Sequence, residues 1–190
     1  MNRIGEKRTA LSKSWFEGKK KKDKEVLKTL NNNISNYFKH KLRASSDTIG
    51  WSTFKDYKSS LTDNGRKYVR ALTSEENKNK SELPPELECF IPCNCRATNA
   101  YAERYNLAYM INWFVNPYIV KFFKQREIEI DQDQYALCEM LQWIWRSRIR
   151  NMESIEIYIP SKRMRELLIS WMDEYSIKEC SAFQNPEKVA

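Results

Sequence analysis

The stretch from residue 135 to residue 175 constrains the fold most, because the spacing of its apolar residues changes period twice. The first part repeats at helical spacing, at Leu137, Leu141 and Ile144. The second part alternates apolar and polar residues, with Ile155, Ile157 and Ile159 on one side. Pro160 ends this predicted strand, and Ser161 can cap a helix whose apolar stripe continues to Tyr175. The order helix, strand, helix predicts one layer of an α/β domain.

A polar stripe runs along the first of these helices, opposite its apolar stripe. It consists of Gln142, Arg146 and Arg150, and Trp143, Trp145 and Ile149 flank it. A helix that is apolar on nearly every other side belongs in an interior. An unpaired guanidinium costs several kcal/mol to desolvate, so the two arginines are expected to meet an anion. That anion is either a carboxylate of the same fold or a phosphate.

The charge is distributed unevenly over the 190 residues. Residues 1–80 hold 20 Lys and Arg against 9 Asp and Glu, whereas residues 81–190 hold 13 against 16. A basic N-terminal part ahead of a nearly neutral part predicts a surface for a polyanion. No apolar run is long enough for a membrane span or a signal peptide, and five cysteines fit a reducing compartment, so a cytoplasmic location is expected.

Composition and charge divide the chain into four expected segments. We expect a basic flexible arm at 1–22, a basic helical segment at 23–80, an α/β domain at 81–175 and a loose tail at 176–190. The predicted elements ahead of residue 135 are a helix over 23–44 capped by Asp23, a helix over 51–61, a turn at Asp63-Asn64-Gly65, a loop over 74–85, a strand over 87–91, a helix over 100–114, a helix from Asn116 with a buried side of Tyr118, Ile119, Phe122 and Phe123, and a helix from Asp131 or Asp133.

Candidate nucleic-acid contacts are the basic residues of the first 60 positions and one polar loop. They are Lys19, Lys20, Lys21, Lys22, Lys39, Lys41, Arg43, Lys55, Lys58, Arg96, Thr98 and Asn99. The aromatic residues near Lys55 and Lys58 fit a buried core better than a stacking surface. A single histidine, His40, excludes a His-based triad or a multi-His metal site. Cys89, Cys93 and Cys95 lack a standard zinc spacing, so structural thiols and no metal are expected.

Three runs together resemble a known family. They are Cys-Asn-Cys-Arg-Ala-Thr-Asn-Ala-Tyr (93–101), Gln-Trp-Ile-Trp-Arg-Ser-Arg-Ile-Arg (142–150) and Ile-Tyr-Ile-Pro-Ser-Lys-Arg-Met-Arg (157–165). They are similar to the C-terminal part, the second RecA-like domain, of superfamily-two helicases from phages and conjugative elements, and the likeness covers roughly residues 13–175. It implies an α/β, helix-rich, RecA-like half with few short strands and an N-terminal helical extension.

The resemblance also implies a site. Gln142 and Arg146 would lie at a nucleotide cleft, with Arg146 and Arg150 as arginine-finger candidates and the loop of Arg96, Thr98 and Asn99 coupling nucleotide to nucleic acid. In this chain Trp145 replaces the glycine of the family pattern Gln-x-x-Gly-Arg-x-x-Arg, and Arg150 lies one residue later. No phosphate-loop motif is present, so the chain alone is not expected to hydrolyse ATP, and ATP and Mg²⁺ enter only with a partner domain.

Three interpretations remain open at this point. The first is a helicase-derived C-terminal domain that binds nucleic acid, with DNA favoured, and that completes an ATPase with a separate partner. The second is a non-enzymatic binding protein or inhibitor of a host nucleic-acid-processing complex, for example a CRISPR effector. The third is a basic α/β domain whose arginine stripe is ion-paired internally.

Overall fold

The computed structural model describes residues 4–61, 89–94 and 99–184, with backbone alone at residue 22 and from 176 onward. The elements in chain order are α1 (Lys13–Lys22), α2 (Lys24–Asn36), the π-helix η1 (Tyr37–Lys41), β1 (Ile49–Ser52), the 3-10 helix η2 (Lys55–Tyr57), α3 (Lys58–Leu61), β2 (Asn106–Tyr109), α5 (Pro117–Lys124), α6 (Gln132–Ile144), the 3-10 helix η5 (Arg148–Asn151), β3 (Glu156–Tyr158) and α7 (Lys162–Gln184). The turn at 63–65 and the loop over 74–85 lie outside the described residues.

The strands form a parallel sheet in the order β1-β2-β3, with Leu107 of β2 opposite Gly50 on one side and Ile157 on the other. Phe90 adds a parallel bridge to Trp51 on the outer side of β1. The predicted strand at 87–91 is thus confirmed in its described residues, as a short pairing at the sheet edge. Gly50 permits close packing, because an added Cβ would lie 2.7 Å from the Ile91 side chain.

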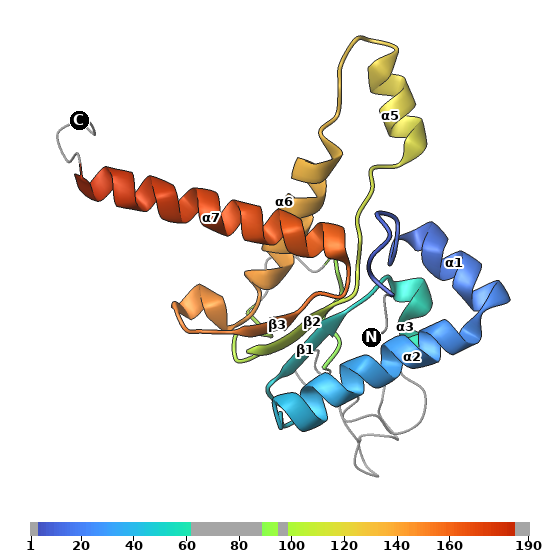
Figure 1. The fold of residues 1–190 in the computed structure, drawn as a ribbon, viewed down its shortest axis with the longest axis vertical. Helices are drawn as coiled ribbons and strands as arrows, with labels where there is room; N and C mark the ends of the chain where they lie inside the picture. Colours follow the sequence, from blue (N-terminus) through green and yellow to red (C-terminus); the bar gives the residue numbers. More distant parts are fainter. Residues whose placement is uncertain (1–3, 62–88, 95–98, 185–190) are drawn as a thin grey trace.

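Helices cover both faces of this sheet (Figure 1). On one face Tyr37, at the end of α2, stacks on Tyr158 of β3 with ring centroids 5.0 Å apart. On the other face Trp143 of α6 lies 5.1 Å from the Tyr109 ring of β2. Tyr158 and Tyr109 point to opposite faces, because paired neighbours share a face and successive residues alternate. The protein is therefore a three-layer α/β/α domain, which confirms the predicted fold class.

Local capping signals positioned the helices correctly. Asp23 accepts from the Val26 amide at the start of α2, and Asp131 accepts from two amides at the start of α6. Asn116 caps α5 ahead of its first-turn proline. Ser161 accepts from the Met164 amide in the first turn of α7. Together with β3, which lies inside the predicted strand, these starts are confirmed.

One predicted helix is replaced by a strand, and another begins later than predicted. The segment predicted as a helix over 100–114 contains β2. In the segment predicted as a helix over 51–61, Trp51 lies in β1, and the helical part is confined to η2 and α3 at residues 55–61. Residues 107–111 are all fully buried. A central parallel strand buried on both faces has a continuous apolar run, and such a run over a short segment fits either period. The aromatic residues at 51, 54 and 57 are buried, which confirms their core assignment.

The two chain ends are more ordered than predicted. The expected flexible arm at 1–22 contains α1, and Leu11 and Phe16 within it are fully buried. Phe16 stacks on Tyr57 at 5.1 Å, so this segment belongs to the core. At the other end α7 runs to Gln184, where a loose tail from residue 176 was expected.

Helix α5 shows the opposite error. Its apolar side was predicted to be buried, but no residue of this helix is buried, and Tyr118 is 83% exposed. Figure 1 shows α5 on a long excursion that leaves the body between β2 and α6. The helical period was therefore correct, and the assumption that an apolar side must face the core was wrong.

Candidate functional site

The carboxyl edge of the sheet is where open parallel α/β sheets bind ligands, at the point where the strand order reverses direction. The chain pairs outward from β1 to Phe90 and then returns to place β2 on the other side of β1. The reversal therefore lies between β1 and β2. Thr53 and Asn112, which follow these strands, are both fully buried there.

The chain's own N-terminal segment fills this reversal point. The Asn112 side-chain amide donates to the carbonyls of Arg8 and Ala10, each at 2.8 Å, and its backbone amide donates to the Leu11 carbonyl. Gly5 packs so closely that an added Cβ would lie 1.6 Å from the Pro160 carbonyl oxygen. The edge where a ligand is expected is therefore sealed by residues 5–12.

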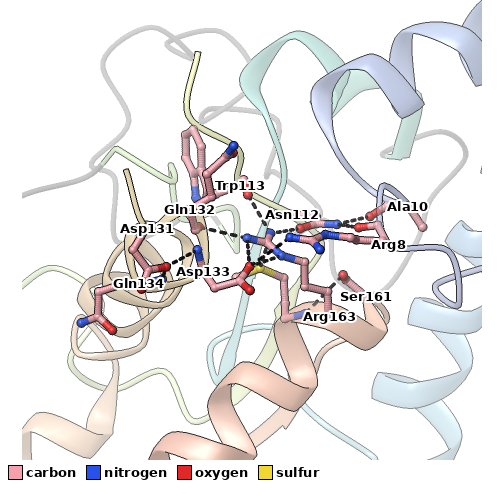
Figure 2. A network of polar contacts seen from close by, with 11 residues as sticks. Arg8, Ala10, Asn112, Trp113, Asp131, Gln132, Asp133, Gln134, Ser161 and Arg163 are labelled. Atoms are coloured by element: carbon pink, nitrogen blue, oxygen red, sulfur yellow. Dashed lines mark hydrogen bonds and ion pairs between the residues drawn. The ribbon is translucent and has the colours of Figure 1, made fainter. Parts of the chain in front are cut away.

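An arginine at the start of α7 ties this seal together (Figure 2). Arg163 is 8% exposed. Its Nε donates to Asp133 Oδ1 at 2.7 Å, and its two terminal nitrogens donate to Asn112 Oδ1 and to the carbonyls of Trp113 and Gln132. Its guanidinium also lies over the Phe114 ring, 4.5 Å from the centroid. Every nitrogen of this guanidinium is thus engaged by the fold.

The amino edge of the sheet is different, and it carries the arginines that the sequence singled out. Helix α6 starts beside the carboxyl-edge network at Asp133 and ends near the amino end of β2, where the Arg148 amide donates to the Arg104 carbonyl. The helix was predicted to continue through Arg150, but it ends at Ile144, and η5 carries Arg150. The expected single stripe of Gln142, Arg146 and Arg150 is therefore broken by a turn.

Arg146 lacks the partners that a buried arginine requires. Its side chain is half-buried, and its Nε is buried with no hydrogen-bond partner. No carboxylate among the described residues forms an ion pair with it. A buried donor without an acceptor costs about 1–3 kcal/mol. Internal neutralisation of Arg146, one of the three interpretations, is not seen in this part of the fold.

The two sequence motifs meet at Arg150. Arg150 is exposed and donates from Nη1 to the Asn99 side-chain oxygen, so the loop at 99 and the arginine segment meet. Gln142 is exposed on α6, and the exposed Trp145 lies beside Arg146 in sequence. Arg96 and Thr98 lie outside the described residues. The structure therefore brings Asn99 and Arg150 together.

The candidate lysines lie mainly on the helical layer of α1, α2 and η1. Lys20, Lys21, Lys39, Lys41, Arg43 and Lys55 are exposed, and Lys19 and Lys58 are half-buried. Two of them are paired on their own helix, because Lys19 contacts Asp23 at 2.9 Å and Lys21 contacts Glu17 at 2.8 Å. The Lys19 contact lowers the pKa of Asp23, and the Lys21 contact lowers that of Glu17.

Basic charge remains on this layer after those pairs. Residues 13–41 contain nine lysines and three carboxylates. The chain leaves η1 at Lys41 and enters the amino end of β1 at Ile49, and Arg43 lies in this connection. A surface of this sign attracts a polyanion.

The thiols carry little chemistry in the described part of the chain. Cys89 is buried and donates to the Ser46 carbonyl at 3.1 Å, as a structural thiol does. Burial raises the pKa of Cys93, which disfavours the reactive thiolate. Among residues that the structure describes, no group of three His, Cys, Asp or Glu side chains is placed to hold a metal. Nor is any helix there long and apolar enough to cross a membrane.

Sequence reasoning missed the residues that seal the carboxyl edge. Arg163 was read only as part of the run after β3, and Asn112 was placed inside a helix that does not form. The available signal was positional, since a polar residue directly after each apolar strand run points to a strand's carboxyl end.

Comparisons with known proteins agree with this architecture. Residues 1–172 match the family described as the YonV C-terminal Rossmann-like domain. The chain is 42% identical over 173 residues to the SPbeta prophage-derived protein YonV of Bacillus subtilis strain 168. That match covers 91% of the chain and 36% of YonV, so the chain spans about a third of that relative's length. No solved structure matches. The chain belongs to the family of YonV C-terminal Rossmann-like domains.

Proposed function

We propose that this chain is the nucleic-acid-binding, arginine-supplying half of a two-part ATPase of the superfamily-two helicase type. In this proposal Arg146 places positive charge beside a nucleotide that another domain holds, and Arg150 is the outer arginine of the pair. ATP and Mg²⁺ belong to the partner domain, which supplies the phosphate loop that this sequence lacks.

The observation that carries the proposal is that the Nε of Arg146 is buried without a hydrogen-bond partner and that no carboxylate of the described residues forms an ion pair with this arginine. Natural folds rarely leave a buried donor without an acceptor, and the exceptions require an explanation such as an external ligand. Arginine suits phosphate in particular, because its planar donors match phosphate oxygens. The position of Arg146 is compatible with this assignment, since residues 5–12 occupy the usual ligand position between β1 and β2 and Arg146 lies toward the opposite edge of the sheet.

The relative's length is compatible with a two-part protein. About two thirds of YonV lies outside the matched region, and the family description calls the matched part C-terminal. A second α/β domain fits within that remainder. The basic layer of α1, α2 and η1 would hold nucleic acid by phosphate contacts, with affinity that falls steeply as salt rises.

The test is ATP hydrolysis by the segment that precedes the C-terminal domain in YonV, measured with Mg²⁺ and single-stranded DNA. Turnover should be low for that segment alone and should rise when the present chain is added. Arg146→Lys should then reduce turnover by about a thousandfold or more, because lysine keeps the charge and loses the planar donors.

Arg126→Lys is the matched control, because Arg126 is an exposed arginine on a different segment and contacts only Phe122 in the described structure. It should leave turnover unchanged. Equal turnover by the preceding segment with and without this chain would contradict the proposal, as would full turnover with Arg146→Lys.

A further inference from the structure

A deep groove lies between the projecting helix α5 and the N-terminal segment around residues 9–14. Its volume is about 1080 Å³. It is lined by the chain that follows β2, at residues 112–116, and by residues of α5. The groove is separate from the amino edge, because Tyr135 in the first turn of α6 lines it and Arg146 follows the opposite end of that helix.

The surface of the groove is mainly apolar and contains several aromatic rings. These rings belong to Phe54, Trp113, Phe114 and Tyr135. Trp113 meets the Phe54 ring edge-on at 5.3 Å and the Tyr135 ring at 6.4 Å, so the rings support one another. Tyr135 is 37% exposed and Trp113 is half-buried, so both present ring surface.

All charged side chains that line the groove are lysines. They are Lys13, Lys121 and Lys124. Lys13 contacts Asp56 at 3.4 Å with both side chains exposed, a pair that holds weakly in water. Among the described residues no carboxylate pairs with Lys121 or Lys124. The acids of the connector to α6 do not line the groove itself, but Glu127 and Glu129 line an adjoining hollow that shares Lys124 with it.

We infer that this groove binds single-stranded nucleic acid, with bases against the Trp113 and Tyr135 rings and phosphates at Lys121 and Lys124. Exposed aromatic faces combined with positive charge are the two components of single-strand binding surfaces. A duplex keeps its bases stacked inside and would leave the aromatic wall unused. An acidic peptide would match the lysines but would reach the rings only through aromatic side chains of its own, whereas every nucleotide carries a planar base.

This inference deepens the proposed function, because it rests on nucleic-acid binding and names where the strand lies. It adds a contact that the basic residues of α1, α2 and η1 do not provide, since most of those lysines lie outside the groove. It also gives a role to the side of α5 that lines the groove, which includes the exposed Ile119 and the two lysines.

The experiment measures binding of a short fluorescein-labelled oligo(dT) to the full chain by fluorescence anisotropy across a range of salt concentrations. The double substitution Lys121→Gln and Lys124→Gln should reduce the slope of log affinity against log salt by about 1.4, for two lost phosphate contacts on a single strand. Tyr135→Leu should weaken binding by about fivefold or more, and Tyr135→Phe should restore it.

Two substitutions on α7 serve as matched controls. Lys162→Gln removes an exposed lysine that pairs with Glu166, and Tyr175→Leu removes an exposed ring away from the groove. Both should leave affinity and salt slope unchanged. Thermal melting of each variant separates a lost contact from lost folding.

The outcomes distinguish this inference from the proposed function. Binding that ignores the groove substitutions but falls with Lys20→Gln and Lys24→Gln on α1 and α2 would overturn the groove and leave nucleic-acid binding in place. No oligonucleotide binding by the unsubstituted chain would overturn both nucleic-acid statements, and the groove would then suit a protein surface. The ATPase measurement with Arg146→Lys is independent of each result.

Discussion

The two edges of the sheet each present an arginine, and the two arginines differ in their partners. At the carboxyl edge Arg163 is nearly inaccessible and is bonded to a carboxylate, an amide oxygen and two carbonyls. At the amino edge Arg146 is half-buried, with its Nε buried and unpartnered. The first arrangement holds the fold together, whereas in the second no carboxylate of the described residues neutralises the guanidinium.

The comparison also shows that the candidate site does not lie at the edge of the sheet where ligands usually bind. Ligands of open α/β sheets bind at the carboxyl edge. Here residues 5–12 of the chain itself lie at that edge. The general rule therefore gives the right position, but a segment of the protein is found there in place of a ligand. The residues that the sequence singled out, Arg146 and Arg150, lie toward the other edge.

The largest expected effect is at Arg163. Arg163→Met should destabilise the protein by about 2–4 kcal/mol, because it leaves the Asn112 oxygen and the carbonyls of Trp113 and Gln132 without a donor. The estimate is below that for a fully buried pair, since the Asp133 side chain is 47% exposed. Urea unfolding followed by circular dichroism measures the change, and a loss below about 1 kcal/mol would contradict a structural role.

A glycine pair tests how tightly the carboxyl edge is sealed. Gly5→Ala should cost about 1–3 kcal/mol, because its Cβ would overlap the backbone at Pro160. Gly18→Ala is the control, since nothing lies within 4 Å of a Cβ added in helix α1. It should stabilise by about 0.5–1 kcal/mol. Equal effects from the two substitutions would show that residues 5–12 are not closely packed.

A smaller effect is expected from the carboxylate in the same network. Asp133→Asn keeps an oxygen for the Arg163 Nε and removes the negative charge, so it should cost about 1 kcal/mol. Glu166→Gln on α7, in an exposed pair with Lys162, is the control and should change the unfolding free energy by less than about 0.5 kcal/mol. If Glu166→Gln lowers the unfolding free energy as much as Asp133→Asn does, the carboxyl-edge network contributes no more to stability than an exposed ion pair.

Sequence alone predicted the elements whose ends carry their own signal. Asp23, Asn116, Asp131 and Ser161 each start a helix through a side chain that accepts from a nearby amide, and this chemistry is local. The alternation of isoleucines with polar residues around β3 is also a local pattern, and it predicted this strand correctly. The α/β class followed from these elements.

The errors arose where tertiary context decides. The buried run 107–111 and the strand around Trp51 have apolar spacing that fits either period, and only the neighbouring strands select the extended form. Helix α6 stops at Ile144, although its apolar pattern continues, and the chain then turns toward Arg104. Local pattern gives the period of a segment and leaves its partner undetermined.

The site was predictable in part. The sequence indicated Asn99 and Arg150 as candidate site residues, and the structure joins them by a hydrogen bond. It also brought forward Arg146, but as one line with Gln142 and Arg150, which the turn after α6 breaks. The Arg163 network combines residues from four separate segments, a combination that a single sequence does not encode in any local spacing.

The most direct test of the central claim compares Arg146→Met with Arg163→Met in the same urea unfolding experiment. If Arg146 is held for an external phosphate, replacing it should change the unfolding free energy by less than about 0.5 kcal/mol or should stabilise the chain, because a buried unpartnered donor is removed. A loss for Arg146→Met as large as that for Arg163→Met would show that the fold itself uses this arginine, and the account would be contradicted.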